Sequence, residues 1–177
     1  APQLFEDRKR NIMCGGFVQC GDVDAALDAA DATVEAQYTT SFVEHGYIEP
    51  EAGFAEVVGG RIHVHACTQA PAMDREALAY DRPMADIRIV PTAVGGGFGS
   101  KIDLSLQPFI AIAALKTGRP VRMTYSRVET MQSTTKRHPA QITIKVGAKA
   151  DGALSGLRFD GDFNTGAYAS WGPTVAN

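Results

Sequence analysis

Apolar and polar residues alternate along several stretches of this chain, and this period of two predicts β-strands. The clearest pair is 54–58 and 62–66, because the two stretches are separated by Gly59-Gly60, a two-residue turn that favours a β-hairpin. The stretches 140–148 and 154–163 predict a second hairpin. Further strands are expected over 33–42, 86–90 and 121–125.

Three segments carry the composition of helices. Residues 22–31 are rich in alanine, and their early aspartates suit a helix N-terminus. A short helix is expected over 73–80. The segment 104–116 is apolar and stops at Gly118-Arg119-Pro120, a glycine followed by a proline, which is typical of a helix C-terminus. Pro108 would then lie in the first turn, where its missing N–H group costs little.

The predicted strands occur both in hairpins and beside helices, which indicates an α+β fold with a mixed sheet, hairpins and a few helices on one side. The 177 residues, 45% of them hydrophobic, suffice for one globular unit with its own core. Residues 1–20 show no sustained period and are expected to form a linker or extended arm, which leaves 21–177 as the domain. The chain stops shortly after Trp171-Gly172-Pro173, so we expect it to be a piece of a longer polypeptide.

Charge and composition exclude several classes of partner. The net charge is −3 and the longest basic cluster is Arg8-Lys9-Arg10, so no nucleic-acid partner is expected. No apolar stretch approaches the roughly 20 residues that a membrane-spanning helix needs, so no membrane partner is expected either. Cys14, Cys20 and Cys67 lack the spacing of zinc or redox motifs, which predicts free thiols and a cytoplasmic location.

The run from Val94 to Lys101, Val-Gly-Gly-Gly-Phe-Gly-Ser-Lys, follows a predicted strand and is the strongest candidate for a binding site. Its glycines let several main-chain N–H groups approach one ligand closely, and Phe98 would form a wall beside that ligand. A dinucleotide fingerprint would need a glycine where Ser100 stands, and a P-loop would need a hydroxyl residue where Ile102 stands. Both are disfavoured, while a simple strand-to-helix turn stays open.

The segment 42–51 gathers three carboxylates and an imidazole. Glu44 and His45 are adjacent, so on a strand they would point to opposite faces. Buried hydrogen-bonding roles are therefore favoured over a metal site in this segment.

Three further features carry candidate chemistry. His63 and His65 share one strand face with Arg61, which favours a solvated face over a metal pair. Gln69 follows a hairpin strand, where its neutral amide can donate to an oxygen ligand. The basic residues 136–138 precede a strand, and ion pairing or contact with a phosphate competes with simple exposure.

Taken in order, the motifs of this chain resemble the molybdopterin-binding large subunit of the molybdenum hydroxylases, the xanthine dehydrogenase and aldehyde oxidase family. The resemblance covers about residues 21–177, and the segments 101–105 and 165–170 are most similar to the nicotinate dehydrogenase branch. The ordered set is much more specific than any one motif. The matching motifs are Glu44-His45-x-x-x-Glu49-Pro50, Thr68-Gln69-x-Pro71, Gly95 to Lys101, Thr117-Gly118-Arg119-Pro120-Val121, Arg137-His138-Pro139 and Gly166-Ala167-Tyr168.

The resemblance implies the first half of a molybdenum-cofactor-binding domain. It implies that Gln69 lies beside the apical ligand of molybdenum and that the backbone amide of Phe98 faces the metal centre. Gly96, Gly97 and Gly99 would let the chain pass close to the molybdopterin, whose form, with or without a nucleotide, stays open.

The resemblance also implies a reaction, the oxidation of an aldehyde or an N-heteroaromatic compound with oxygen derived from water. Electrons would leave through iron–sulfur clusters and FAD on other domains or subunits. Purine-oxidising members carry a glutamate where Ile102 stands, so xanthine itself is not expected. The family's glutamate base is expected beyond Asn177, so no catalytic residue is assigned here and the fragment alone should be inactive. The expected partners are the remainder of the large subunit, the iron–sulfur and flavin partners, and a small-molecule substrate.

Two other functions stay open at this point. The chain could be a non-catalytic scaffold or electron-transfer docking domain, or a dinucleotide-dependent enzyme that uses the glycine run. Metal analysis of the full-length protein distinguishes them, because only the hydroxylase requires molybdenum.

Overall fold

The computed structural model of the protein describes residues 2–3, 6, 9–80 and 82–175. The chain divides into two compact units, Val43–Arg137 and a unit in which Ala1–Phe42 join His138–Asn177. The length predicted one globular unit, so this division differs from the expectation. Its cause is that the chain leaves the first sheet after one strand and returns to it about 100 residues later. The expected boundary between residues 20 and 21 stays a prediction.

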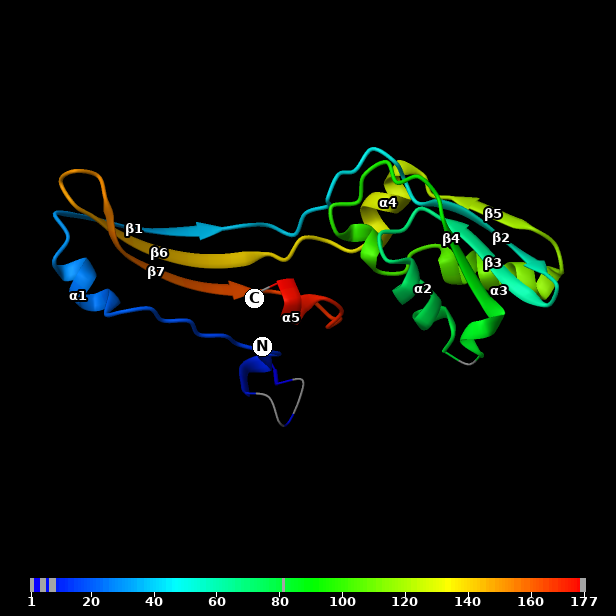
Figure 1. Cartoon of the computed structure of the whole chain (residues 1–177), viewed down its shortest axis with the longest axis horizontal. Helices are drawn as coiled ribbons and strands as arrows, with labels where there is room; N and C mark the ends of the chain where they lie inside the picture. Colours follow the sequence, from blue (N-terminus) through cyan, green and yellow to red (C-terminus); the bar gives the residue numbers. More distant parts are fainter. Residues whose placement is uncertain (1, 4–5, 7–8, 81, 176–177) are drawn as a thin grey trace. The chain divides into compact units, whose positions relative to one another are not determined.

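The unit formed by the two chain ends is an antiparallel sheet of three strands, in the order β1-β6-β7 (Figure 1). The helix α1 packs on this sheet through Leu27, which lies over Gly147 and Gly156. A Cβ atom at Gly147 would lie 3.1 Å from Leu27 Cδ2, so the glycines in the strands make room for the helix. The bounds are α1 Val23–Asp28, β1 Ala32–Thr39, β6 Ala140–Ala148 and β7 Leu154–Phe163, with the short helices η1 Lys9–Asn11 and α5 Gly172–Val175.

The second unit is built on a mixed sheet of four strands in the order β4-β3-β2-β5. The strands β3 and β4 are parallel, and α2 lies between them in the chain, as a parallel connection requires. The strands are β2 Ala52–Val58, β3 Arg61–Ala66, β4 Ile87–Pro91 and β5 Val121–Thr124. The helices are α2 Pro71–Leu78, η2 Met84–Asp86, η3 Ser100–Ile102, α3 Gln107–Thr117 and α4 Arg127–Ser133.

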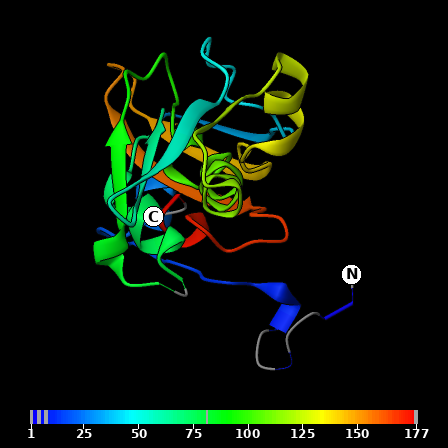
Figure 2. The ribbon, with the colours of Figure 1, turned by 90° about the vertical axis from the view of Figure 1, so that its right-hand side faces the viewer.

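The core of the second unit lies between the sheet and α3, which is seen end-on beside the strands in Figure 2. Ile110 on the helix and Val64 on β3 have no exposed surface. Because side chains on a strand alternate between faces, the opposite face of the sheet stays outside this core. The buried cluster consists of Ala55, Ile62, Val64, Ala66, Ile87, Leu106, Ile110, Ala111 and Ala114.

The structure confirms the α+β class, both hairpins and each of the predicted helices and single strands, with shifted ends. The helix expected from residue 104 begins at Gln107, so Pro108 does lie in its first turn, and Gly118 ends it with a φ of 65°. The sequence did not predict α4, although Ser126 and Glu129 form a capping box at its start. The three cysteines are free thiols, as predicted. Among the described residues, no helix has the length and apolar character to cross a membrane.

Candidate functional site

The glycine run forms a tight bend between β4 and α3. Gly96 and Gly99 both have a φ of +99°, which favours glycine, and Phe98 has a φ of +51° although it carries a side chain. A non-glycine residue in this region costs about 1–3 kcal/mol and persists only where its surroundings hold it. Phe98 is 63% exposed, so the bend presents this aromatic residue to the surface.

The side chain of Gln69 lies against this bend. Its Oε1 accepts hydrogen bonds from the amide nitrogens of Gly99 at 3.1 Å and Lys101 at 3.3 Å, while the main-chain amide of Gln69 donates to the Lys101 carbonyl oxygen at 2.8 Å. A Cβ atom at Gly97 would lie 2.3 Å from Gln69 Oε1, so only glycine fits beside the carboxamide. Because Oε1 is held by the backbone, the Nε2 group is left as the free end of the side chain, and it is a donor only.

Several donors of this site have no acceptor among the residues that the structure describes. Within the described ranges, the N–H groups of Gly96, Gly97 and Phe98 and the Nε2 group of Gln69 make no hydrogen bond. Consecutive free amides in a bend with left-handed residues are typical of an anion-binding concavity. The site therefore offers hydrogen-bond donors, without a formal charge, to a group rich in acceptor atoms.

Glu49 and Lys101 fix the two ends of the bend. Glu49 Oε2 accepts from the amide of Gly95 at 2.8 Å and from Lys101 Nζ at 2.7 Å. The Lys101 side chain is 2% exposed, and its Nζ also lies 4.7 Å from the ring centre of Tyr47. Burial acts to raise the pKa of Glu49, but the hydrogen bonds from Lys101 and Gly95, the charge of Lys101 and a contact with Cys67 act against it, and the net effect lowers that pKa.

A buried polar network lies beneath Gly96. The Tyr47 hydroxyl donates to the Glu51 carboxylate, whose other oxygen accepts from Thr130 Oγ1 at 2.7 Å. Burial, followed by the hydrogen bond to Glu51, raises the pKa of Tyr47 to about 12. A Cβ atom at Gly96 would lie 3.0 Å from Tyr47 Cβ, so the tyrosine supports the bend from below.

His45 lies near Gly99 in the bend, and its neighbour Glu44 forms an ion pair. Glu44 Oε2 pairs with Lys136 Nζ at 2.8 Å, so Lys136 has the ion-pairing role that the sequence left open. A Cβ atom at Gly99 would lie 3.9 Å from His45 Nε2. Burial, and then the charge of Arg137, lower the pKa of His45, which favours a neutral ring beside the bend.

The structure thus brings Gln69, Gly96, Gly97, Phe98 and Gly99 together. It also supports the hydrogen-bonding roles favoured for the segment 42–51, since Glu49 holds the glycine bend at Gly95 and Glu51 holds Thr130 on α4. Among the described residues, Glu44 and His45 belong to no group of metal-ligating side chains. The Glu49 to Lys101 contact was missed, although both residues lie in motifs that the sequence singled out, because 52 positions separate them.

Comparisons with known proteins identify the family of this chain. Residues 4–177 match the family described as "Molybdopterin cofactor-binding domain". The chain is 42% identical over 179 residues to a probable xanthine dehydrogenase subunit of Bacillus subtilis, a match that covers 99% of this chain and 24% of that protein. It is 40% identical over 168 residues to "Nicotinate dehydrogenase large molybdopterin subunit" of Eubacterium barkeri, covering 93% of this chain and 40% of that protein. The chain therefore spans less than half the length of these relatives.

The fold of this chain is similar to part of a solved structure of the aldehyde oxidoreductase from Desulfovibrio gigas, with a TM-score of 0.77 and 29% sequence identity. The match covers 87% of this chain and 17% of that one. The described fold therefore corresponds to one part of a much larger polypeptide in that enzyme.

Proposed function

Because this chain belongs to the molybdopterin cofactor-binding domain family, we propose that it forms part of the cofactor-binding subunit of a hydroxylase of the xanthine dehydrogenase and aldehyde oxidase type. The whole protein would oxidise an aldehyde or an N-heteroaromatic compound with oxygen derived from water. The relatives named as nicotinate dehydrogenase and aldehyde oxidoreductase support this substrate class.

The donor set around Gln69 carries the proposal. The Gln69 carboxamide has its oxygen bound to the backbone, and its Nε2 group and the Phe98 amide have no acceptor among the described residues. A molybdenum-pterin group is rich in oxygen and sulfur atoms that accept hydrogen bonds, so these residues fit it. When bound, that cofactor supplies the redox chemistry of the hydroxylation.

In this assignment each residue binds or orients and none acts as a base. Gln69 donates from Nε2, and Phe98 donates from its main-chain amide. Gly96, Gly97 and Gly99 would allow the backbone to approach the cofactor closely, because they carry no side chain. At Gly97 the absence of a Cβ atom also makes room for the Gln69 carboxamide. The Phe98 ring is exposed and is placed to limit the access of water.

Glu49 and Lys101 act as positioning residues. Their ion pair holds Gly95 at one end of the bend and Lys101 at the other, which fixes the amides between them. The Lys101 charge compensates the Glu49 charge beside the bend.

The substrate is proposed to be something other than xanthine, because Ile102 stands where purine-oxidising members carry a glutamate. Iron–sulfur clusters and FAD are proposed to lie on other domains or subunits. No residue of this chain is proposed as the catalytic base.

The test is metal analysis of the purified full-length protein, combined with assays on an aldehyde, nicotinate and xanthine. The proposal expects about one molybdenum per large subunit. It also expects oxidation of the aldehyde or of nicotinate in preference to xanthine. A protein that is free of molybdenum when produced in a host that makes the cofactor would favour the scaffold or docking function instead.

A further inference from the structure

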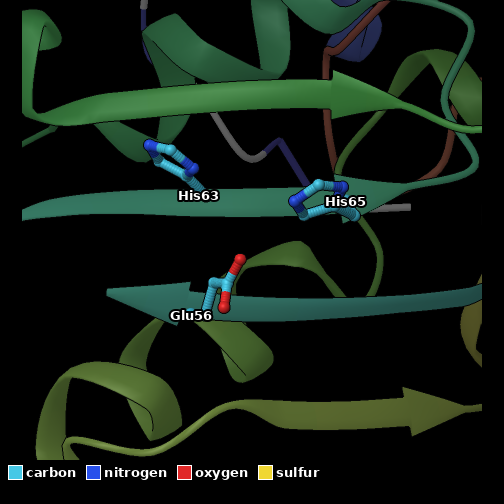
Figure 3. A group of neighbouring side chains, drawn as sticks. All are labelled: Glu56, His63 and His65. Carbon is cyan, nitrogen blue, oxygen red and sulfur yellow. The ribbon is translucent and has the colours of Figure 1, made fainter. Parts of the chain in front are cut away.

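A second group of side chains lies on the sheet of the second unit. Glu56 on β2 and His63 on β3 are direct cross-strand partners, and His65 lies two positions further along β3. Residues two apart on a strand share a face, so all three lie on the face opposite the core residues Ala55 and Val64. Figure 3 shows the two imidazoles over β3 and the Glu56 carboxylate directed toward them.

The three side chains are close enough to share one ion. One ligand atom from each can be chosen so that all lie within 4.8 Å of one another, and each residue is half-buried. Ligand atoms around a tetrahedral zinc ion lie about 3.3 Å apart, so side-chain torsions alone need to adjust. The backbone is already held by the hairpin hydrogen bonds, which keeps the site preorganised.

Phe54 orients one of the imidazoles. Its ring is the cross-strand partner of His65, and the two rings stack with centroids 4.2 Å apart and planes 7° from parallel. Stacking restricts the rotation of the His65 ring, so less entropy is lost when a metal binds.

Three arginines share this face and place positive charge near the group. Arg88 is the partner of His63 across β3 and β4, Arg122 is the partner of Phe54 across β2 and β5, and Arg61 lies two positions before His63. Their charges oppose a divalent cation, which limits the affinity. The same charges favour a small anion as a further ligand of a bound ion.

We propose that Glu56, His63 and His65 bind one divalent transition-metal ion of the zinc class. Two neutral imidazoles and one carboxylate suit Zn²⁺ and leave at least one position for water or a small anion. The sequence favoured a solvated face for the two histidines. It gave no sign of Glu56 beside them, because that closeness depends on how β2 and β3 pair.

The experiment is a titration of the purified full-length protein with Zn²⁺, measured by isothermal calorimetry. Any affinity tag is removed beforehand. The titration uses a Cys14→Ser, Cys20→Ser background, because the two exposed thiols would also bind Zn²⁺. The proposal expects one site whose dissociation constant is in the micromolar range. Co²⁺ replaces Zn²⁺ as a spectroscopic probe. The absorption spectrum of bound Co²⁺ should lack the near-ultraviolet charge-transfer band that a thiolate ligand would give.

Glu56→Gln and His63→Gln should each weaken Zn²⁺ binding by at least about tenfold. The control is His138→Gln, which removes a half-buried histidine outside the group and should leave the affinity unchanged. Circular dichroism without metal checks that each variant is folded, and Glu56→Gln keeps the size of the side chain. The proposal is overturned if folded Glu56→Gln and His63→Gln bind as tightly as their background, or if the background binds no Zn²⁺ at millimolar concentration.

Discussion

Gly97 and Gln69 are in such close contact that no side chain can be added between them, since a Cβ atom at Gly97 would lie 2.3 Å from Gln69 Oε1. The carboxamide and the bend therefore act as one unit. Whatever displaces one of them also displaces the donors of the other.

Gly97→Ala should accordingly disrupt cofactor binding. The added methyl group forces Gln69 away from the amides of Gly99 and Lys101. We expect the molybdenum content of the full-length protein to fall at least about tenfold, measured by mass spectrometry of the metal. Gly15→Ala is the control, because a Cβ atom at Gly15 meets nothing within 4 Å. Full molybdenum occupancy in Gly97→Ala would contradict the packing argument.

Gln69→Glu tests the acceptor and donor functions of the carboxamide separately. A glutamate still accepts from Gly99 and Lys101, so the free energy of unfolding should change by less than about 1 kcal/mol. It replaces the donor Nε2 with a carboxylate oxygen, so turnover should fall by about 100-fold in steady-state assays. Gln37→Glu, on the exposed side of β1, should leave turnover unchanged. Equal turnover in Gln69→Glu and the wild type would show that no donor is needed there.

Lys101→Met should destabilise the second unit. It leaves the Glu49 carboxylate partly buried without its cation, and such a loss costs about 2–4 kcal/mol. The double variant Glu49→Gln, Lys101→Met should recover part of this loss, because the unpaired charge is then absent. Urea denaturation of the four proteins in the cycle measures the coupling. If the two substitutions changed the free energy of unfolding additively, the ion pair would not be what holds the ends of the bend.

Tyr47 should titrate far above an ordinary tyrosine. Its pKa is about 12 in the fold, against 10.0 for a tyrosine in water, so the protonated form is favoured by folding. This contribution to stability is complete below pH 10 and is lost as the pH rises through about 12. Absorbance of the phenolate at alkaline pH should show a step near pH 12 that is absent in Tyr47→Phe, while a late step from Tyr125, whose pKa burial also raises, should remain. An unchanged titration curve in that variant would refute the assignment.

Local signals in the sequence determined most of the fold. The Gly59-Gly60 turn and the Gly118 helix end each act over a few residues, and both were predicted correctly. The family membership predicted from the ordered motifs is confirmed. The helix α4 was missed because its segment is polar and unpatterned, although the spacing of Ser126 and Glu129 was a usable signal.

Contacts between residues far apart in the chain could not be predicted from the sequence. The pairing of β1 with β6 joins residues more than 100 positions apart, and no local pattern indicates it. The same holds for the Glu49 to Lys101 ion pair, and for Glu56 beside His63, which depends on the hairpin register. The closeness of Gln69 to the glycine bend was expected only from the resemblance, since 30 positions separate Gln69 from Gly99.

The central claim is that the Gln69 carboxamide and the Phe98 amide face a molybdenum centre. Crystals of the full-length protein, measured on both sides of the molybdenum absorption edge, give the position of the metal directly. The account predicts one anomalous peak beside the glycine bend, with Gln69 Nε2 and the Phe98 amide within hydrogen-bond distance of the ligands of that metal. A molybdenum peak elsewhere, with the bend covered by packed side chains and Gln69 turned away, would contradict it.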